Sequence, residues 1–408
     1  MDIPGLPARK GALKLLDAVL NRGETLDQAT NAALLGVKGN ADRALAKALA
    51  GEALRWLTGL DMMIDSATRL PLAHDAKVRS VLRLMLAGWL RLETPPHAVI
   101  ATALPLLTGG PRRLAHGVFS TLTKRGAALP ASPTLPAEVA SRWGERAGVI
   151  AAGLGHLPPL DLTLRDAAET AAWVERLGGV SLMPGHVRLG RGTAVENIEG
   201  YDEGAWWVQD LAASLPARLL GAGEGRTVLD LCAAPGGKTL QLAAAGWRVS
   251  ALDASARRLE RVEQNLARTS LTAEIIAADA LAWEPPALFD AVLLDAPCTA
   301  TGTCRRHPDV LHRIGPRQIA EQADLQALLL ERAAQWVKPG GTLVFAVCSL
   351  EPEEGEAQAA TVRLAPKPIR ADELPTGIAA STDGFVRTDP GMLADAGGLD
   401  GFFIARWR

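Results

Sequence analysis

Cysteine and aromatic residues are both scarce in this chain, and each scarcity excludes a class of protein. Four cysteines among 408 residues cannot form the disulfide scaffold of a small secreted domain, so we expect a reducing, cytoplasmic environment. Aromatic residues account for 4% of the chain, which argues against a broad platform for stacking nucleic-acid bases. The amino-terminal sequence MDIPGLPARKGALKLL also lacks the basic start and continuous apolar core of a signal peptide.

Long uninterrupted apolar runs are missing as well. The stretch LRLMLAGWLRLE at residues 82–93 contains Arg83 and Arg91, so it falls short of the roughly 20 apolar residues that cross a bilayer. We therefore expect no membrane partner. The chain is 48% hydrophobic and 22% charged, which is ordinary for a globular protein, and its length suffices for two or three domains.

The small net charge of −2 hides an uneven distribution. Residues 1–130 contain 17 Lys and Arg against 10 Asp and Glu, a balance of +7, and the rest of the chain carries −9. A basic amino-terminal module on an acidic body predicts a polyanionic partner for that module. Solvated helix faces would produce the same count, and this alternative stays open.

Three regions follow one another along the chain. Residues 1–128 read as all-helical, because apolar residues such as Leu13, Leu16 and Leu20 recur at helical spacing. A proline-rich segment at 129–137 marks a boundary. Residues 138–222 predict a small mixed α+β linker domain, with helices expected at 138–152 and 166–177 and an extended stretch at 157–165.

Strand and helix patterns alternate in the third region, residues 223–408. Apolar strand-like runs occupy 227–232, 248–253, 274–279, 289–298, 342–348 and 402–407. Helices are expected at 256–268 and 316–337. This alternation predicts an α/β domain with a parallel sheet that is covered on both faces.

Chemically useful residues collect where these strands end. Cys298 and Cys348 each follow an apolar run, and Asp295 precedes Cys298 closely. Because the carboxyl ends of parallel strands line the ligand crevice, two thiols and a carboxylate there suggest covalent chemistry. The alternative is a pair of buried, inert cysteines, since free cysteine is often buried.

The glycine-rich turn after the first strand predicts a nucleoside-containing ligand. Its sequence CAAPGGKT nearly matches the phosphate-binding motif, but Cys232 stands where that motif requires glycine, and the dinucleotide fingerprint is absent. An NTPase and a nicotinamide enzyme are therefore disfavoured. S-adenosylmethionine has no phosphate and needs a close backbone approach and an acid for its ribose, and Asp253 follows Asp230 at a suitable spacing.

Four motifs together resemble the RsmB (Sun/Fmu) family of ribosomal-RNA cytosine-5 methyltransferases. They are LDLCAAPGGK at 229–238, DAPCTATGTCRRHPD at 295–309, VCSLEPEEGE at 347–356 and DGFFIARW at 400–407. Residues 1–128 resemble the NusB-like RNA-binding domain that precedes the catalytic domain in this family. The resemblance implies a Rossmann-like S-adenosylmethionine-dependent methyltransferase domain after the NusB-like and linker domains.

The resemblance also implies roles for individual residues. Cys348 matches the nucleophile, Cys298 the second catalytic cysteine, and Asp295 would lie near the methyl-transfer centre. Asp253 would bind the ribose of the cofactor and Asp279 would lie beside its adenine. The implied cofactor-binding residues are Cys232, Ala233, Ala234, Pro235, Gly236, Gly237, Lys238, Asp253, Asp279 and Asp295.

Other residues near these motifs are open to two interpretations. Arg305, Arg306 and His307 are predicted to contact RNA phosphates, although a solvated loop would look the same. Trp206 and Trp207, expected on an amphipathic helix, could stack on bases, but at least one of them is expected in the core. We predict no metal site, because Cys298 and Cys304 lack the tight spacing of zinc ligands and no paired histidines accompany them.

The chain departs from the family pattern at several positions. Val347 stands where threonine is usual, Gly355 where asparagine is usual, Thr299-Ala300 where Ser-Gly is common, and Cys304 where an aliphatic residue is usual. Both catalytic cysteines are nevertheless present. We predict a monomeric RNA cytosine-5 methyltransferase that acts on small-subunit ribosomal RNA through a covalent cysteine adduct. The alternatives are a non-catalytic ribosome-assembly factor and the same chemistry on tRNA.

Overall fold

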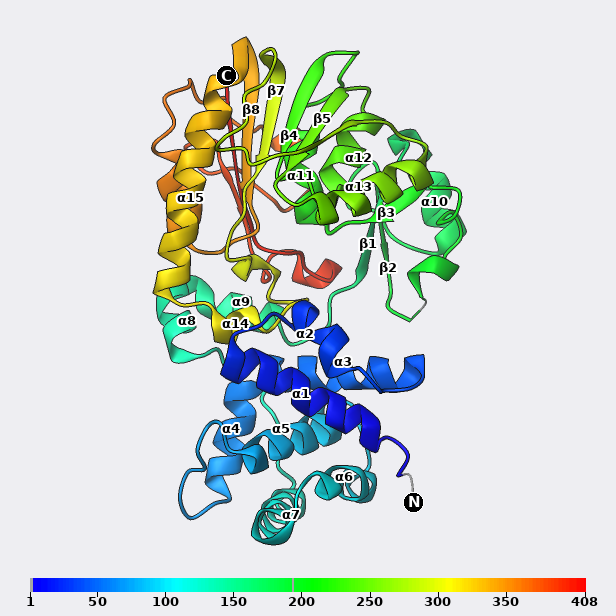
Figure 1. Ribbon diagram of the computed structural model, residues 1–408, viewed down its shortest axis with the longest axis vertical. Helices are drawn as coiled ribbons and strands as arrows, with labels where there is room; N and C mark the ends of the chain where they lie inside the picture. Colours follow the sequence, from blue (N-terminus) through cyan, green and yellow to red (C-terminus); the bar gives the residue numbers. More distant parts are fainter. Residues whose placement is uncertain (1–2, 193) are drawn as a thin grey trace. The chain divides into compact units, whose positions relative to one another are not determined.

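The computed structural model describes residues 3–192 and 194–408 of the chain, which forms two compact units (Figure 1). The helical unit extends to residue 156 and also contains residues 304–314. The sheet unit comprises residues 157–303 and 315–408. The segment 304–314 thus packs with the helical residues, although it lies within the region that the sequence assigns to the catalytic domain. The three predicted domain boundaries stay predictions.

Ten α-helices of the helical unit lie within the described residues. They are α1 (Leu6–Arg22), α2 (Leu26–Ala33), α3 (Asn40–Arg55), α4 (Leu57–Ser66), α5 (Lys77–Leu90), α6 (Pro96–Ala103), α7 (Gly109–Lys124), α8 (Ala137–Trp143), α9 (Ala147–Gly153) and α14 (Val310–Arg313). Helix α5 is buried along most of its length, and α1, α3, α4, α6 and α7 pack against it. The all-helical character predicted for residues 1–128 is confirmed. The single helix expected at 138–152 is instead two, α8 and α9, separated at Gly144 with a positive φ of 54°.

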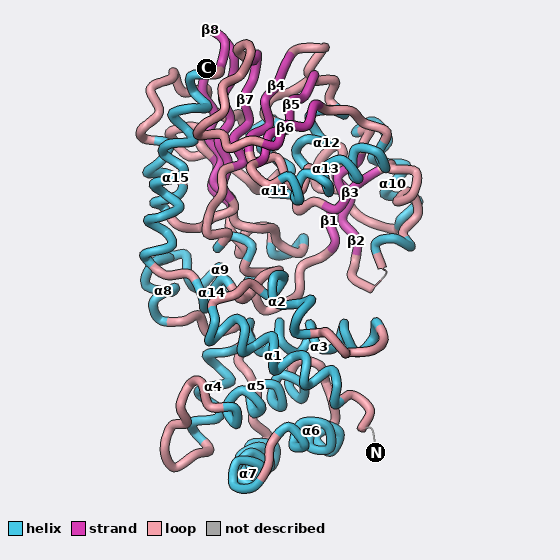
Figure 2. The backbone as a smooth tube through the Cα atoms, viewed as in Figure 1, coloured by secondary structure: helices cyan, strands magenta, loops and turns pink. Residues whose placement is uncertain are grey.

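The sheet unit contains a seven-stranded sheet with the order β6-β5-β4-β7-β8-β10-β9 (Figures 1 and 2). Its strands are β4 (Thr227–Leu231), β5 (Arg248–Asp253), β6 (Glu274–Ala277), β7 (Phe289–Asp295), β8 (Val337–Val347), β9 (Val386–Thr388) and β10 (Phe402–Trp407). The first five are parallel to one another, as predicted. Strand β10 runs antiparallel to β8, and β9, which the sequence did not reveal, pairs antiparallel with β10.

Helices cover both faces of this sheet, and this part of the prediction is confirmed. The helices are α11 (Leu211–Arg218), α12 (Gly237–Ala244), α13 (Ala256–Thr269) and α15 (Pro316–Gln335). Alternate strand residues point to opposite faces, so Val228 belongs to one apolar core with α11 and α12. Leu229 belongs to a second core, in which Leu329 and Leu330 of α15 lie. Two apolar faces explain why the strands read as nearly continuous hydrophobic runs.

A small antiparallel sheet with the order β2-β1-β3 precedes the large one. It consists of β1 (Leu160–Leu164), β2 (His186–Leu189) and β3 (Trp206–Val208), with α10 (Thr170–Leu177) beside it. The helix expected around Trp206 and Trp207 is wrong, because both residues lie on β3. Both indoles are buried, as their core alternative required, and Trp206 Nε1 donates to the Glu199 carbonyl at 2.8 Å. Buried rings of this kind are unavailable for stacking on RNA bases.

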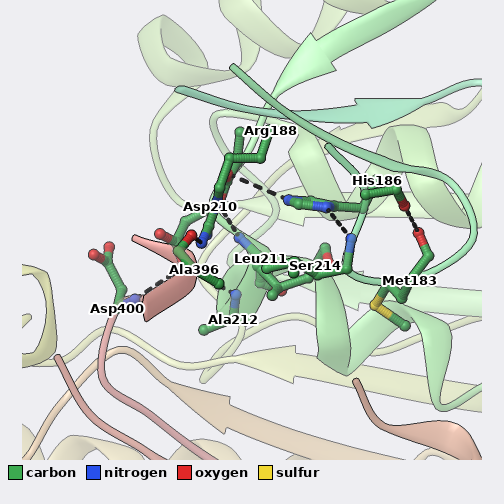
Figure 3. A network of polar contacts seen from close by, with 12 residues as sticks. Met183, His186, Arg188, Asp210, Leu211, Ala212, Ser214, Ala396 and Asp400 are labelled. Carbon is green, nitrogen blue, oxygen red and sulfur yellow. Dashed lines mark hydrogen bonds and ion pairs between the residues drawn. The ribbon is translucent and has the colours of Figure 1, made fainter. Parts of the chain in front are cut away.

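A buried polar network joins the small sheet to α11 and to the loop before β10 (Figure 3). Asp161 on β1 accepts two hydrogen bonds from Arg188 on β2, at 2.6 and 2.8 Å, and one from the Leu211 amide at 3.0 Å. Asp210 accepts from the Asp400 amide at 3.1 Å. Burial alone would raise the pKa of Asp161, but the hydrogen bonds from Arg188 and His186 outweigh it and lower that pKa. The network therefore fixes the small sheet through an ionised carboxylate.

Candidate active site

The loop between β4 and α12 is shaped for a close backbone approach. Its last residue, Gly236, has a φ of +105° and precedes the first turn of α12. A Cβ at this position would lie 3.1 Å from a methyl carbon of Val262 on α13, so space and backbone conformation both favour glycine. Backbone N–H groups at the start of a helix remain free to bind a ligand.

Asp253, at the carboxyl end of β5, holds this loop. Its carboxylate is 1% exposed and accepts from the Ala234 amide at 3.2 Å and from the Ser255 amide at 2.9 Å. Asp279 follows β6, has an exposed side chain and accepts from the Leu281 amide at 2.9 Å. The structure therefore brings Asp253 to the predicted cofactor loop, while Asp279 caps the next turn.

Asp230 is a further buried carboxylate, on β4, that the sequence analysis used only as a spacing marker. Its Oδ2 accepts from the Thr239 hydroxyl at 2.6 Å, and its Oδ1 has no hydrogen-bond partner among the described residues. Complete burial raises the pKa of Asp230 to about 7. A charged residue inside an apolar strand is the signal that could have marked it.

Cys232 begins the loop and has a φ of +61°. Burial, together with the nearby carboxylates Asp295 and Asp253, raises the pKa of its thiol to about 12. A thiol in this state is a poor nucleophile, since the thiolate is the reactive form. Cys232 is accordingly a loop residue rather than a third reactive cysteine.

Lys238 and Asp295, two residues expected at the cofactor site, form an ion pair for which their sequence spacing gives no signal. Lys238 on α12 donates from Nζ to Asp295 Oδ2 at 2.7 Å, and its Nζ lies 5.4 Å from the ring centroid of Phe402. Asp295 ends β7, and its side chain keeps 30% of its exposure. Lys238 thus fixes the orientation of the Asp295 carboxylate, which remains accessible to solvent or to a ligand.

The two candidate catalytic cysteines lie next to each other. Cys298 and Cys348 follow the neighbouring parallel strands β7 and β8, and their Sγ atoms are 3.4 Å apart. The hydrogen bond with Cys348, and then burial, raise the pKa of the Cys298 thiol well above its usual range. Cys298 therefore keeps its proton while Cys348 stands beside it.

Close backbone contacts fix the end of β8 that carries Cys348. The Gly302 amide donates to the Cys348 carbonyl at 3.0 Å, and the Gly401 amide donates to the Gly302 carbonyl at 2.8 Å. A Cβ on Gly302 would lie 2.0 Å from the Gly401 carbonyl oxygen, so only glycine permits this approach. The loop after Cys298, the end of β8 and the start of β10 are thereby held together.

The residues from Cys304 to Ile314 belong to the helical unit. Cys304 is completely buried, Arg305 is 1% exposed, Arg306 is exposed and His307 is half-buried. Arg305 is thus inaccessible to an RNA phosphate in this conformation, and the predicted contact stays a prediction for Arg306 and His307. Within residues 3–192 and 194–408 there is no cluster of three His, Cys, Asp or Glu side chains suited to a metal ion. No helix in the same part of the chain is long and apolar enough to cross a membrane.

Comparison with known proteins identifies the family. Residues 217–408 match the family described as 16S rRNA methyltransferase RsmB/F, and residues 6–108 match the NusB family. The chain is 33% identical over 382 residues to the ribosomal RNA small subunit methyltransferase B of Xanthomonas campestris pv. campestris, covering 87% of both chains. It is 32% identical over 428 residues to the protein of that name from Erwinia tasmaniensis, covering 97% of both. The chain belongs to the RsmB/F methyltransferase family.

Membership of this family confirms the predicted enzyme class. This RsmB/F protein is a methyltransferase, and S-adenosylmethionine is its cofactor. Two solved structures share its fold. The crystal structure of PH0851 has a TM-score of 0.73 at 21% identity and covers 100% of this chain and 99% of its own. A methyltransferase homolog from Pyrococcus horikoshii has a TM-score of 0.56 at 26% identity and covers 66% of this chain and 92% of its own.

The residues around the β4–α12 loop fit S-adenosylmethionine chemically. Asp253 offers a buried carboxylate to hydroxyl donors, and the open backbone at Gly236 suits a close contact without a phosphate. Asp230, whose Oδ1 has no hydrogen-bond partner in the described part of the chain, lies on the strand that leads into the loop. We expect Asp253 and the loop backbone to hold the cofactor, with Asp279 at the next strand end.

Proposed function

We propose that this RsmB/F protein methylates carbon 5 of a cytosine in small-subunit ribosomal RNA through a covalent adduct with Cys348. The observation that supports this proposal most strongly is the 3.4 Å separation of the Cys298 and Cys348 sulfur atoms at the ends of adjacent strands. The ion-paired carboxylate of Asp295 ends the same strand that precedes Cys298. A non-catalytic assembly factor would have no need of two adjoining thiols beside a cofactor loop.

The reaction requires each thiol at a different stage. Carbon 5 of cytosine is a poor nucleophile, but addition of the Cys348 thiolate to carbon 6 turns the ring into an enamine. The cofactor supplies an electrophilic methyl group for carbon 5. Cys298 then removes the proton from carbon 5, directly or through water, and the electrons of that C–H bond restore the ring double bond and expel the Cys348 thiolate. Asp295 would orient the base through a hydrogen bond near N3, which requires a proton at that contact.

The pKa shift of Cys298 fits this order of events. Its largest cause is the hydrogen bond with Cys348, and the charge of Cys348 contributes as well. Once Cys348 is bonded to carbon 6, it neither shares that hydrogen bond nor carries a thiolate charge. The largest cause of the raised pKa of Cys298 is then removed, which favours release of its proton to solvent and its use as the base when carbon 5 must lose a proton.

Ribosomal RNA as substrate is supported by the names of the relatives and by the helical unit. The full-length relatives are named as small-subunit ribosomal RNA methyltransferases, and residues 6–108 match NusB. The excess of seven positive charges in residues 1–130 suits a polyanion. We expect Arg306 and His307 to contact the RNA close to the modified cytosine.

The two cysteines can be separated by trapping the adduct. Cys348→Ala should abolish methyl transfer and leave no covalent RNA complex, because the adduct cannot begin. Cys298→Ala should still attack and transfer but release slowly, and a protein–RNA adduct should accumulate on a denaturing gel. Cys304→Ala is the matched control and should retain most turnover without a stable adduct. If neither substitution at the pair trapped RNA and both variants stayed active, covalent catalysis would be excluded for this protein.

Bisulfite sequencing identifies the substrate. RNA from a strain lacking the protein should lose one or more 5-methylcytosines in small-subunit ribosomal RNA. Expression of the intact chain should restore them, and expression of Cys348→Ala should not. Loss confined to tRNA would assign the same chemistry to a different RNA.

A further inference from the structure

A buried carboxylate lies behind the two thiols. Glu354 belongs to the short 3-10 turn Pro352–Glu354 after β8, and its side chain is completely buried. Its Oε1 accepts from the Thr299 amide at 2.8 Å and from Gln326 Nε2 at 3.1 Å. Its Oε2 accepts from the hydroxyls of Thr299 and Ser349. Four donors thus converge on one carboxylate.

These donors flank the two cysteines. Thr299 follows Cys298 and Ser349 follows Cys348 in the chain, so Glu354 links the residue after one thiol to the residue after the other. Gln326 on α15 also donates to the Pro297 carbonyl at 2.8 Å. The Cys298 backbone is therefore held on both sides, by Gln326 before it and by Glu354 after it.

The four donors that bind the Glu354 carboxylate are all uncharged groups. No Lys, Arg or His side chain in the described part of the chain forms an ion pair with it. Burial raises the pKa of Glu354 despite the hydrogen bonds from Ser349 and Thr299, which favour its ionised form. Burying a carboxylate without a cation is costly, and a structural link alone could be made with less polar groups.

The hydrogen-bonding capacity of a carboxylate suits the position of Glu354. It accepts hydrogen bonds at both oxygens and donates none when ionised, so it can hold several donors from two loops at once. An amide in its place would present an N–H₂ donor to one of the two loops. Carbons 5 and 6 of cytosine are bonded to each other, so the thiols that serve them must also stay adjacent through the reaction.

We propose that Glu354 is the positioning residue that keeps Cys298 and Cys348 adjacent, by tying the loop after β7 to the end of β8. This inference rests on the proposed function of the two thiols. Glu354 acts through Thr299 and Ser349 and does not contact the base.

Chemical cross-linking measures the separation of the thiols without any methyl transfer. Diamide takes two electrons and two protons from a pair of adjacent thiols and leaves a disulfide, which peptide mapping of the full-length protein identifies. The intact chain should form the Cys298–Cys348 disulfide readily. Glu354→Gln should form it at least 10-fold more slowly. Glu353→Gln, an exposed neighbour, is the matched control and should react like the intact chain.

Kinetics provide the second readout. Glu354→Gln should lower kcat for methyl transfer at least 10-fold and leave the KM for S-adenosylmethionine unchanged, because the hydrogen-bond partners of Glu354 include none of the proposed cofactor-binding residues. Should Glu354→Gln fail to fold, Ser349→Ala and Thr299→Val each remove one hydroxyl donor and should each slow cross-linking several-fold. Unchanged cross-linking and turnover in a folded Glu354→Gln protein would overturn the positioning role. Methylation that survived Cys348→Ala would instead refute the proposed function, and the cross-linking rates would still decide the role of Glu354.

Discussion

At the scale of single residues, the site is built from carboxylates whose environments differ. Asp295 is partly exposed and paired with Lys238, Asp253 is buried against backbone amides, and Asp230 is buried with one oxygen unpaired within the described residues. The first two are held in place by a cation or by backbone donors. Burial is the largest cause of the raised pKa of Asp230, so the protonation of this carboxyl group should affect stability near neutral pH.

The pKa of Asp230, about 7 in the folded protein and near 4 when unfolded, predicts a pH-dependent stability. Its contribution is complete below the unfolded pKa and is lost as the pH rises through the folded pKa. Each unit of pKa shift corresponds to about 1.4 kcal/mol. Asp230→Asn should remove this dependence. The melting temperature of the variant minus that of the intact protein should therefore be larger at pH 8 than at pH 5. An equal difference at the two pH values would contradict the raised pKa of Asp230.

Asp253 is expected to contribute to cofactor binding in two ways. It offers acceptors to the ribose, and it holds the Ala234 amide of the loop. Asp253→Ala should weaken S-adenosylmethionine binding by about 1–3 kcal/mol, as measured by isothermal titration. Glu263→Ala, an exposed acid on α13, should leave the affinity unchanged. Equal affinities for the intact protein and Asp253→Ala would reject the ribose role.

At the scale of elements, the spacing of apolar residues predicted the helices and strands whose limits depend on nearby sequence. The strands β4, β5 and β10 match the expected runs closely, and α13 and α15 end within two residues of their expected limits. Trp206 and Trp207, expected on an amphipathic helix, lie instead on a strand. Their strand is fixed by pairing with β1, some 40 residues earlier in the chain.

The features of the site that the sequence did not predict depend on contacts between residues far apart in the chain. The Cys298–Cys348 pair was foreseen because each residue ends a predicted strand, and parallel strands end at the same edge. The Glu354–Thr299 link was not foreseen, since a buried acid in the polar run EPEEGE has no local signal that separates it from its exposed neighbours. Residues 304–314 were assigned to the catalytic domain because nothing in their sequence indicates that they pack with the helices.

Arg55 on α3 explains how the segment 304–314 is held within the helical unit. Its buried guanidinium donates to the Arg305 carbonyl at 2.7 Å and pairs with Glu52 at 3.1 Å. Arg55→Ala should destabilise the helical unit by about 1–3 kcal/mol, because the Arg305 carbonyl loses its donor and the buried Glu52 carboxylate keeps only Arg91 as its ionic partner. Thermal unfolding and limited proteolysis between residues 304 and 314 should report this loss. Lys47→Ala, an exposed change on the same helix, should have little effect; an equally stable Arg55→Ala would show that other contacts hold the segment.

At the scale of the whole molecule, positive charge is in excess in residues 1–130 and negative charge in the rest of the chain. The amino-terminal excess of basic residues includes Arg112 and Arg113, which are exposed near the amino end of α7. Cations at a helix amino terminus oppose the helix dipole, and the first turn of α7 contains no acidic residue that offsets them. A local cost of this kind is consistent with a role in binding an anion.

Substitution is a cleaner test of this basic surface than deletion, because removing residues 1–128 would also strip the segment 304–314 of its packing. Arg112→Glu with Arg113→Glu should weaken binding of the proposed RNA substrate and flatten the dependence of affinity on salt. Each lost phosphate contact should reduce the slope of log K against log salt by about 0.7–0.9. Cofactor affinity should not change. Arg69→Glu, an exposed reversal elsewhere in the helical unit, serves as the control. An unaltered slope in the double variant would mean that these two cations form a solvated helix end, and an equal loss in the control would mean that the charge acts diffusely.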